Sequence, residues 1–365
     1  MKTKMLSMPF EMNGLLLRNR IIMAPMGRSR ADNNTNTVDE LQVTYYKQRA
    51  SAGLIITEGV LVSRDAQGGI NLPAIYNQEQ IDSWRLVTDA VHNQNGSIFI
   101  QLWHTGRMSH PFYHNGLAPL APSPLNPNTQ VYIPTGFTDT VIPREMTVQD
   151  IKQTIKDFKQ AAINAFEAGF DGIELQAGNG YLLHQFFNLY SNNRIDEYGG
   201  SIENRARILF ELLDSLKGAV PINRIAIRLN PSQNDILGMM LDESSIDVHE
   251  YIVKKLNEYD LAYLHLAEPF ISVDNHPYGI SRVTKHFRPL FKGVIISNGG
   301  YNPVTAESAI EDGDADLISF GKYYISNPDL VERISNNWIL NDPDSNTFYT
   351  GGASGYIDYP SYTTD

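Results

Sequence analysis

The side chains best suited to hold and protonate a substrate lie between Ile173 and Tyr181, in the run I-E-L-Q-A-G-N-G-Y. The run begins as a strand in which apolar and polar residues alternate, so Gln176 faces away from the apolar side. Asn179 and Tyr181 follow in a loop. At the carboxyl end of an α/β barrel, where catalysis takes place, two amides and a phenol would then surround a substrate. A polar loop that only caps a strand explains these residues equally well.

Two other strand-like segments predict polar side chains inside a barrel. Alternation leaves Gln101 and Trp103 facing inward in segment 97–104, and it leaves Arg228 inside near the end of segment 224–230. A buried guanidinium needs a partner, because leaving it unpaired costs roughly 3–5 kcal/mol. We expect that partner to be a ligand; the alternative is an internal ion pair with Glu174 on the neighbouring strand.

Glycines and a lysine follow the last two strand-like segments. Gly299 and Gly300 end the seventh segment, and Gly321 and Lys322 end the eighth. Glycine lets a backbone approach an anion closely, and the loops after strands 7 and 8 are the usual phosphate site of α/β barrels. With the interior amide, guanidinium and indole, these residues predict a flat heterocycle that carries a phosphate. FMN fits that description.

The elements that must position these side chains alternate regularly along the chain. We expect strands at 20–26, 54–62, 97–104, 172–177, 224–230, 263–267, 293–298 and 317–322. We expect helices at 41–52, 78–95, 147–168, 201–216, 244–259, 303–311 and 328–337, with the connection after the sixth strand undecided. Eight successive βα units predict an α/β fold, a (β/α)8 TIM barrel, in a single domain 1–365.

Two segments depart from the alternation. Residues 105–146 form a long insertion after the third strand, rich in Pro, Asn and Gly, and we expect a lid over the active face. The tail 341–365 is rich in aromatic residues and glycine, so we expect it to pack on the barrel.

Helix ends carry their own signals. Thr147 is expected to cap one helix, and Asn302 and Asn327 each precede a proline that could occupy a first helical position. Gly169 and Gly313 stand where helices should end.

Composition narrows the class of protein. A net charge of −12 without a basic run argues against nucleic acid or an anionic membrane as partner. The absence of cysteine excludes disulfides, iron–sulfur clusters and thiolate metal sites, and we expect no metal. The first residues lack the apolar stretch of a signal peptide, which predicts a cytoplasmic protein. The assembly is expected to be a monomer or a homodimer.

Several long motifs, in order along the chain, resemble the Old Yellow Enzyme family of FMN-dependent ene-reductases. They are N-R-I-I-M-A-P-M-G-R-S-R (19–30), L-I-I-T-E-G (54–59), Q-L-W-H-T-G-R (101–107), R-I-D-E-Y-G-G-S-I-E-N-R (194–205) and F-G-K-Y-Y-I-S-N-P-D-L (320–330). The tail motif G-Y-I-D-Y-P resembles the bacterial branch, which includes the N-ethylmaleimide and pentaerythritol tetranitrate reductases.

The resemblance implies tightly bound FMN and a transient NAD(P)H reductant. It implies that the isoalloxazine is lined by Pro25, Met26, Gly27 and Gly59. Gln101 would bond its pyrimidine edge, and Arg228 would sit by N1. The phosphate would be held by Gly299, Gly300, Gly321 and Lys322.

The resemblance also implies how the substrate is held. Gln176 and Asn179 would bind an electron-withdrawing carbonyl or nitro oxygen, and Tyr181 would protonate the α-carbon. Trp103 and Tyr349 would line the substrate site. The expected substrates are small molecules with electron-poor C=C bonds: α,β-unsaturated carbonyls and maleimides, with nitro compounds or nitrate esters as an extension.

Four positions depart from the family pattern. Where the family has a histidine, this chain has Gln176, and Gly27 replaces a threonine or cysteine at the flavin. Gly69 replaces a pocket tyrosine, and Lys322 replaces an arginine. Glutamine is a weaker donor that cannot carry charge, and losing one such donor elsewhere costs on the order of 100- to 1000-fold in rate. We therefore expect a working reductase with altered substrate preference.

Two alternatives come from other classes. One is a flavin barrel that oxidises a different small molecule, for which His104 is the nearest base, although a structural role suits it better. The other is an FMN-binding barrel with little turnover. Iron–sulfur amine dehydrogenases are excluded because the chain has no cysteine.

Overall fold

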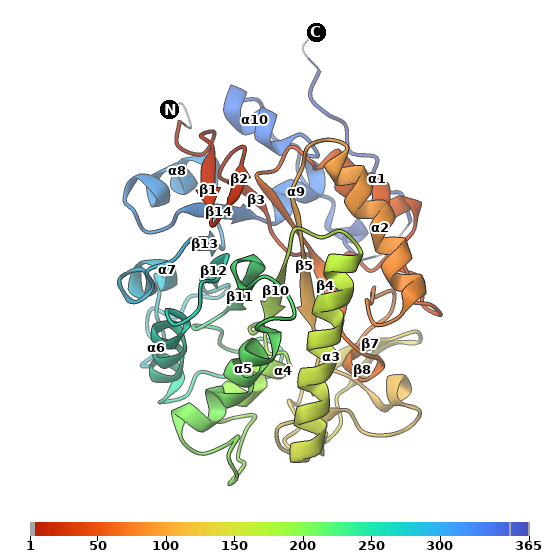
Figure 1. Cartoon of the computed structure of the whole chain (residues 1–365), viewed down its shortest axis with the longest axis vertical. Helices are drawn as coiled ribbons and strands as arrows, with labels where there is room; N and C mark the ends of the chain where they lie inside the picture. Colours follow the sequence, from red (N-terminus) through yellow and green to blue (C-terminus); the bar gives the residue numbers. More distant parts are fainter. Residues whose placement is uncertain (1–3, 350–351, 364–365) are drawn as a thin grey trace.

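The structure, a computed structural model, describes residues 4–349 and 352–363 and is built around a closed barrel of eight parallel strands (Figure 1). In order around the barrel they are β3 (Ile21–Met23), β4 (Leu54–Leu61), β5 (Ile98–Trp103), β10 (Gly172–Gln176), β11 (Ile225–Leu229), β12 (Tyr263–Ala267), β13 (Ile295–Asn298) and β14 (Leu317–Phe320). β14 pairs with β3 and closes the ring. The predicted TIM barrel is confirmed.

Helices surround the barrel and connect its strands. They are α1 (Glu40–Gln48), α2 (Gln78–His92), α3 (Val148–Glu167), α4 (Leu182–Phe187), α5 (Ile202–Leu216), α6 (Ser245–Leu256), α7 (Val283–Phe287), α8 (Pro303–Glu311), α9 (Lys322–Ser326) and α10 (Leu330–Asn336). The short α7 occupies the undecided connection after the sixth barrel strand, and α4 was not predicted.

Most predicted helix ends are confirmed. Thr147 caps α3 through the backbone N–H of Asp150, and Asn302 caps α8. Gly169 and Gly313 follow helix ends with φ of +89° and +74°. The prediction for Asn327 is wrong.

Asn327 ends α9 instead, and Asp329 precedes α10. The side chain of Asn327 donates to the carbonyl of Tyr323 and to Ser326, so it stabilises the end of one helix rather than the start of the next.

The barrel interior is apolar at the amino ends of the strands and polar at their carboxyl ends. Phe99 and Tyr263 belong to a buried interior cluster that the β1–β2 hairpin (Phe10–Met12, Leu15–Leu17) covers from outside. Ile98, Ile100 and Leu102 alternate with the inward residues of β5 and pack in the larger core that the helices share. The predicted inward and outward faces of this strand are therefore observed.

The insertion after β5 contains four short strands. They are β6 (Leu120–Ala121), β7 (Gln130–Ile133), β8 (Gly136–Asp139) and β9 (Arg144–Glu145). β7 and β8 form an antiparallel hairpin, and β6 pairs with β9. In Figure 1 the hairpin lies at the end of the barrel opposite to β1 and β2, which is the end where the strands terminate.

Buried arginines bind the carboxyl-terminal tail. Arg28 donates to the carbonyls of Phe348 and Gly355 at 3.0 and 2.8 Å. Tyr356 is fully buried and stacks on Tyr45, with ring centroids 4.0 Å apart. The expected tail 341–365 includes residues 350–351 and 364–365, which lie outside the described residues.

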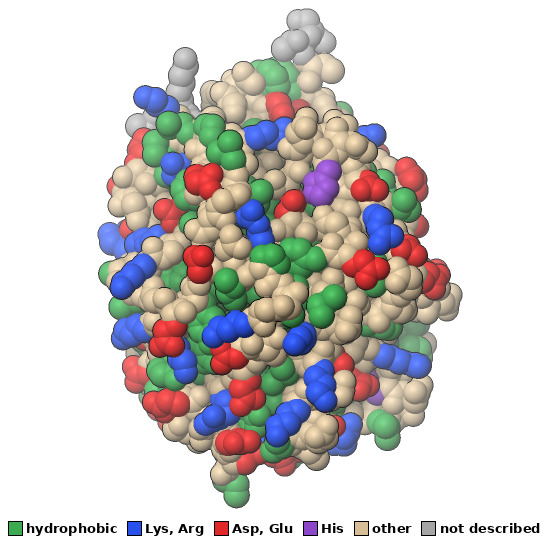
Figure 2. Space-filling view, in the orientation of Figure 1, with side chains coloured by type: hydrophobic (Ala, Val, Ile, Leu, Met, Phe, Trp, Pro, Cys, Tyr) green, Lys and Arg blue, Asp and Glu red, His purple; other side chains and the backbone are tan. Residues whose placement is uncertain are grey.

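No helix in the described part of the chain is long and apolar enough to cross a membrane. On the face shown in Figure 2, acidic and basic side chains are interspersed. The net charge of −12 is thus not gathered into one patch on that face.

Replacing Tyr356 with alanine should lower the free energy of unfolding by about 3 kcal/mol or more, because a fully buried aromatic side chain leaves a cavity. Tyr349→Ala is the matched control from the same tail; its side chain is 61% exposed, so a change within about 0.5 kcal/mol is expected. Urea unfolding measures both. Equal effects of the two substitutions would mean that the stacked ring does not hold the tail.

Candidate active site

Strand register brings the polar interior residues together. Glu174 of β10 pairs with Gln101 of β5, while Arg228 of β11 pairs with Gln176 on one side and His265 of β12 on the other. Because residues with side chains on the same face of paired strands are neighbours, these groups meet inside the barrel near its carboxyl end. We call Gln101, Glu174, Arg228, His265, Asn298 and Ser319 the interior polar layer.

A buried carboxylate links two members of this layer. Gln101 Nε2 donates to Glu174 Oε1 at 2.7 Å, and His265 Nδ1 lies 2.8 Å from Glu174 Oε2. Glu174 and His265 are completely buried. The bond from Nε2 fixes the orientation of the Gln101 amide, and no described residue donates to its Oε1.

Arg228 makes some of its contacts within the layer and leaves one donor without a partner. Nη2 donates to Asn298 Oδ1 at 2.8 Å, and Nη1 lies 2.8 Å from His265 Nε2. Its buried Nε has no hydrogen-bond partner among the described residues. The predicted alternative, a direct ion pair with Glu174, is not observed within the described chain; His265 lies between the two charges.

Burial and charge set the protonation of this layer. Burial, followed by the neighbouring Arg228, lowers the pKa of His265 to about 4, so the imidazole is neutral at pH 7. Burial alone would raise the pKa of Glu174, but His265, Arg228 and Gln101 together hold it below its ordinary value. Glu174 is therefore ionised. Burial also lowers the pKa of Arg228, and Glu174 opposes that shift.

The loop after β10 carries the predicted amide pair. Gln176 Oε1 accepts the backbone N–H of Gly178 at 3.1 Å, which leaves the NH2 group of the side chain available as a donor. Asn179 has a φ of +54°, a left-handed conformation that asparagine tolerates, and its Oδ1 is buried without a partner among the described residues. His184 fixes the turn by accepting the N–H of Gly180.

Tyr181 stands at the end of this loop against Trp103. The two rings meet edge to face, with centroids 4.7 Å apart. Burial, with a contribution from Tyr349, raises the pKa of Tyr181 to about 12, so the phenol is protonated at neutral pH. The indole Nε1 of Trp103 is buried without a partner in the described structure.

These aromatic side chains line a mostly apolar cavity of about 460 Å³. It lies over the carboxyl end of the barrel, and Tyr349 of the tail and the β7–β8 hairpin contribute to its wall. Its lining includes Gly69, Ile70, Leu72, Met108, Val131, Tyr132, Phe137 and Leu237. The predicted acid Tyr181 and the predicted substrate residues Trp103 and Tyr349 therefore share one cavity, whereas Gln176 and Asn179 are not among the residues that line it.

The expected flavin-lining residues lie at the ends of the first two barrel strands. Pro25, Met26 and Gly27 follow β3, and a Cβ atom on Gly27 would meet no other atom within 4 Å. Gly59 is different, because its Cβ would come within 2.6 Å of the Trp103 ring. Glycine at 59 thus lets the indole pack against the strand, a role that the sequence did not suggest.

The expected phosphate residues lie at the ends of β13 and β14. Gly299 and Gly300 have φ of +124° and +68°, and a Cβ on Gly300 would meet nothing. Gly321 lies beside Met26, with 3.5 Å between its ideal Cβ and the sulfur, and Lys322 begins α9 with an exposed side chain.

These features fit FMN. The uncontacted Oε1 of Gln101 can accept from the flavin N3–H, and the unpartnered Arg228 Nε supplies a buried donor. Open space at Gly27 and Gly300 leaves room for a ring and a phosphate. The residues that would hold the group are thus present with unused hydrogen-bonding capacity.

His104 is a structural histidine. Its Nδ1 accepts the N–H of Gly106 at 3.0 Å, and burial, then His114, lowers its pKa to about 3. A ring with so low a pKa and only 2% exposure makes a poor general base, which argues against the alternative of a flavin barrel that oxidises a different small molecule.

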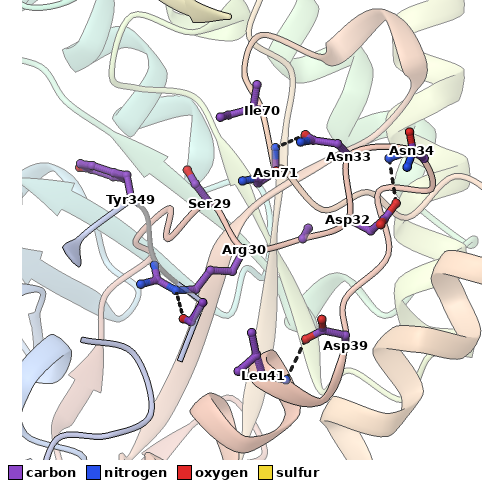
Figure 3. A pocket seen from close by; sticks show the side chains of 12 residues that line it. Ser29, Arg30, Asp32, Asn33, Asn34, Asp39, Leu41, Ile70, Asn71 and Tyr349 are labelled. Carbon is purple, nitrogen blue, oxygen red and sulfur yellow. Dashed lines mark hydrogen bonds between the residues drawn. The ribbon is translucent and has the colours of Figure 1, made fainter. Parts of the chain in front are cut away.

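A second cavity, of about 550 Å³, lies beside the tail and is lined by polar and apolar residues (Figure 3). Its carboxylates already serve the local backbone: Asp39 accepts from Leu41 N–H, and Asp32 accepts from Asn34 N–H. Asn33 likewise accepts from the N–H of Asn71. Of the residues predicted to act on the substrate, Trp103 and Tyr181 line only the first cavity, and Tyr349 lines both.

Sequence reasoning missed His265, Asn298 and Ser319. The segment Y-L-H-L-A of β12 alternates as clearly as β5 does, and the same period-two argument would have turned His265 inward. Asn298 was included in a predicted strand without a role.

Comparison with known proteins shows which family the chain resembles. A family model described as NADH:flavin oxidoreductase / NADH oxidase family matches residues 5–341. The chain is similar to 12-oxophytodienoate reductase 7 of Oryza sativa subsp. japonica, at 38% identity over 96% of this chain and 93% of the relative. It is also similar to 12-oxophytodienoate reductase 2 of Arabidopsis thaliana, at 33% identity over 97% and 94%.

Solved structures agree. Morphinone reductase superposes with a TM-score of 0.92 at 38% identity, covering 98% of this chain and 96% of that one. The old yellow enzyme homologue from Zymomonas mobilis gives 0.91 at 35% identity, covering 97% and 99%.

The buried histidine predicts a pH effect on stability. The folded pKa of His104, about 3, lies below its unfolded value, so between the two values the unfolded chain binds more protons. The free energy of unfolding must then fall as pH drops below about 6.5, by about 2 kcal/mol between pH 7 and pH 5 for one such histidine. His104→Asn, which keeps an acceptor for Gly106, should lose about that much of the pH dependence in urea unfolding at both pH values. An unchanged dependence would show that His104 titrates normally.

Proposed function

The chain belongs to the NADH:flavin oxidoreductase / NADH oxidase family and is an NAD(P)H-dependent flavin oxidoreductase with FMN as cofactor, and we propose that it reduces electron-poor C=C bonds. Its relatives are named for the reduction of 12-oxophytodienoate and morphinone. The proposed substrates are small α,β-unsaturated carbonyl compounds and maleimides, with nitro compounds or nitrate esters as an extension. We further propose a cytoplasmic protein, a monomer or a homodimer, without nucleic acid or membrane partners.

The observation that carries this proposal is the protonated phenol of Tyr181 in the wall of an apolar cavity, at the end of the loop that carries the amide pair Gln176 and Asn179. Gln176 offers its NH2 because Gly178 occupies its oxygen. Tyr181 offers a proton because burial keeps its pKa at about 12. Activated alkenes need both functions: a donor for the electron-withdrawing oxygen, and an acid for the carbon that becomes electron-rich.

FMN, when bound, supplies two-electron chemistry by accepting a hydride from NAD(P)H and giving one to the alkene. Arg228 and Gln101 would hold its ring, with the guanidinium favouring added negative charge. Gln176 and Asn179 would hold the substrate oxygen and draw charge toward it. The Tyr181 hydroxyl would then give its proton to the α-carbon.

The cavity walls favour apolar substrates and restrict water. Trp103 supports Tyr181 edge to face, and Tyr349 closes one side. A Cβ on Gly69 would meet only the side chain of Leu72, so this position adds little bulk to the wall. We infer a preference for ring-shaped or bulky alkenes over short polar ones.

Tyr181→Phe tests the assignment of the acid. The substitution removes one hydroxyl and keeps the packing on Trp103, so reduction of the flavin by NADPH should be unchanged. Reoxidation by an enone such as 2-cyclohexenone should slow about 100-fold or more, which is a usual contribution of a general acid. Anaerobic stopped-flow measurement of each half-reaction separates the two effects. Equal losses in both would show that Tyr181 is structural, and wild-type reoxidation at background rates by every enone, maleimide and nitro compound tried would refute the function.

Gln176→His should increase enone turnover about tenfold or more, because an imidazole is a stronger and stiffer donor. The N–H of Gly178, which now binds Gln176 Oε1, can bind one ring nitrogen and leave the other to donate. A pH profile provides a second readout: the wild-type amide cannot titrate, whereas the variant should gain a pH dependence below the ordinary histidine pKa of about 6.5, because position 176 is buried. Turnover that falls in the variant while flavin reduction stays normal would mean that Gln176 is already the adapted donor.

A further inference from the structure

Two opposite charges are buried in the interior polar layer without touching each other. Glu174 is bound by Gln101 and His265, and Arg228 is bound by His265 and Asn298. An arginine and a carboxylate in a dry interior attract strongly, so separation of the two must be enforced by what lies between them. The imidazole of His265, which is fully buried, occupies that place.

The neighbours of His265 determine its tautomer. The ionised carboxylate of Glu174 can only accept, so Nδ1, at 2.8 Å, must carry the proton. Arg228 can only donate, and its Nη1 lies 2.8 Å from Nε2 and 3.1 Å from Nδ1. Because the carboxylate requires the proton on Nδ1, Nε2 is the nitrogen left to accept from Arg228. Ser319 Oγ, at 2.9 Å, also reaches Nε2. A neutral ring with one donor and one acceptor thus satisfies both charged neighbours.

We propose that His265 is a positioning residue that keeps Glu174 from pairing with Arg228, so that the guanidinium stays available to the bound flavin. With the imidazole in place, Arg228 keeps Nε free of protein partners and Glu174 binds Gln101 instead. Without it, the carboxylate would swing to the guanidinium, and both cofactor contacts would weaken. The inference rests on the proposed flavin function, but it concerns the reduction potential rather than the alkene.

The direction of the effect follows from charge. A reduced flavin carries added negative charge, and a free guanidinium beside it favours the reduced state. His265→Leu has similar bulk and neither donor nor acceptor, so the midpoint potential of bound FMN should become more negative. His265→Gln offers an amide N–H to Glu174 and a carbonyl to Arg228, and should restore most of the wild-type potential. Glu174→Gln should shift the potential in the positive direction, because it removes the opposing anion.

The experiment is dye-calibrated anaerobic reduction of the purified FMN-loaded protein, without any alkene substrate. His249→Leu is the matched control, since it replaces a buried histidine of α6 that bonds Ser245 and contacts no member of the interior polar layer, and it should leave the potential nearly unchanged. A more negative potential in His265→Leu with recovery in His265→Gln supports the proposal. Wild-type potentials in both variants, or equal shifts in both, would overturn it.

If His265→Leu does not fold, His265→Met, which also lacks a hydrogen-bond donor for Glu174, decides: a more negative potential supports the proposal, and an unchanged or more positive potential refutes it. If the proposed function is wrong, the result is different: the reduced flavin of the wild-type protein is not reoxidised by any alkene.

Discussion

Inside the barrel, an arginine and a glutamate are buried at the point where the strands end, and the surrounding structure must satisfy both. Burying a charge without partners costs several kcal/mol, so each group has to find hydrogen bonds within the barrel or from a ligand. Glu174 finds them in Gln101 and His265. Arg228 finds Asn298 and His265 but keeps one buried donor unused. That remaining donor is available to a ligand bound at the carboxyl end of the barrel.

The hydrogen bonds of these buried groups also fix the orientation of nearby amide side chains. Because Glu174 accepts the NH2 of Gln101, the amide oxygen faces away from the carboxylate and toward any group that can donate to it. A similar rule acts in the loop after β10, where the Gly178 N–H occupies the oxygen of Gln176 and leaves its NH2 available. In both places a neighbour of fixed polarity decides which end of an amide is offered. The sequence alone does not say whether the NH2 or the oxygen of a glutamine faces a ligand, and here the neighbouring group decides it.

Much of this could be predicted from period-two alternation and helix caps. Alternation placed Gln101 and Arg228 inside the barrel, and the cap at Thr147 fixed the start of α3. The resemblance to a known family supplied the cofactor and the substrate residues. The charge separation could not be predicted, since it depends on register between β10, β11 and β12, which a single strand does not encode. Likewise, Gly59 is explained by contact with Trp103 on a neighbouring strand, a contact that appears only once the barrel closes.

The most direct test of this account is the visible spectrum of the purified protein, recorded anaerobically while NADPH and then 2-cyclohexenone are added. The account predicts a flavin band that bleaches with NADPH and returns with the enone, because a neutral amide pair and a protonated Tyr181 suffice to activate the alkene. A band that bleaches and does not return with any activated alkene would contradict it, and would leave a flavin barrel whose oxidising substrate is of another class.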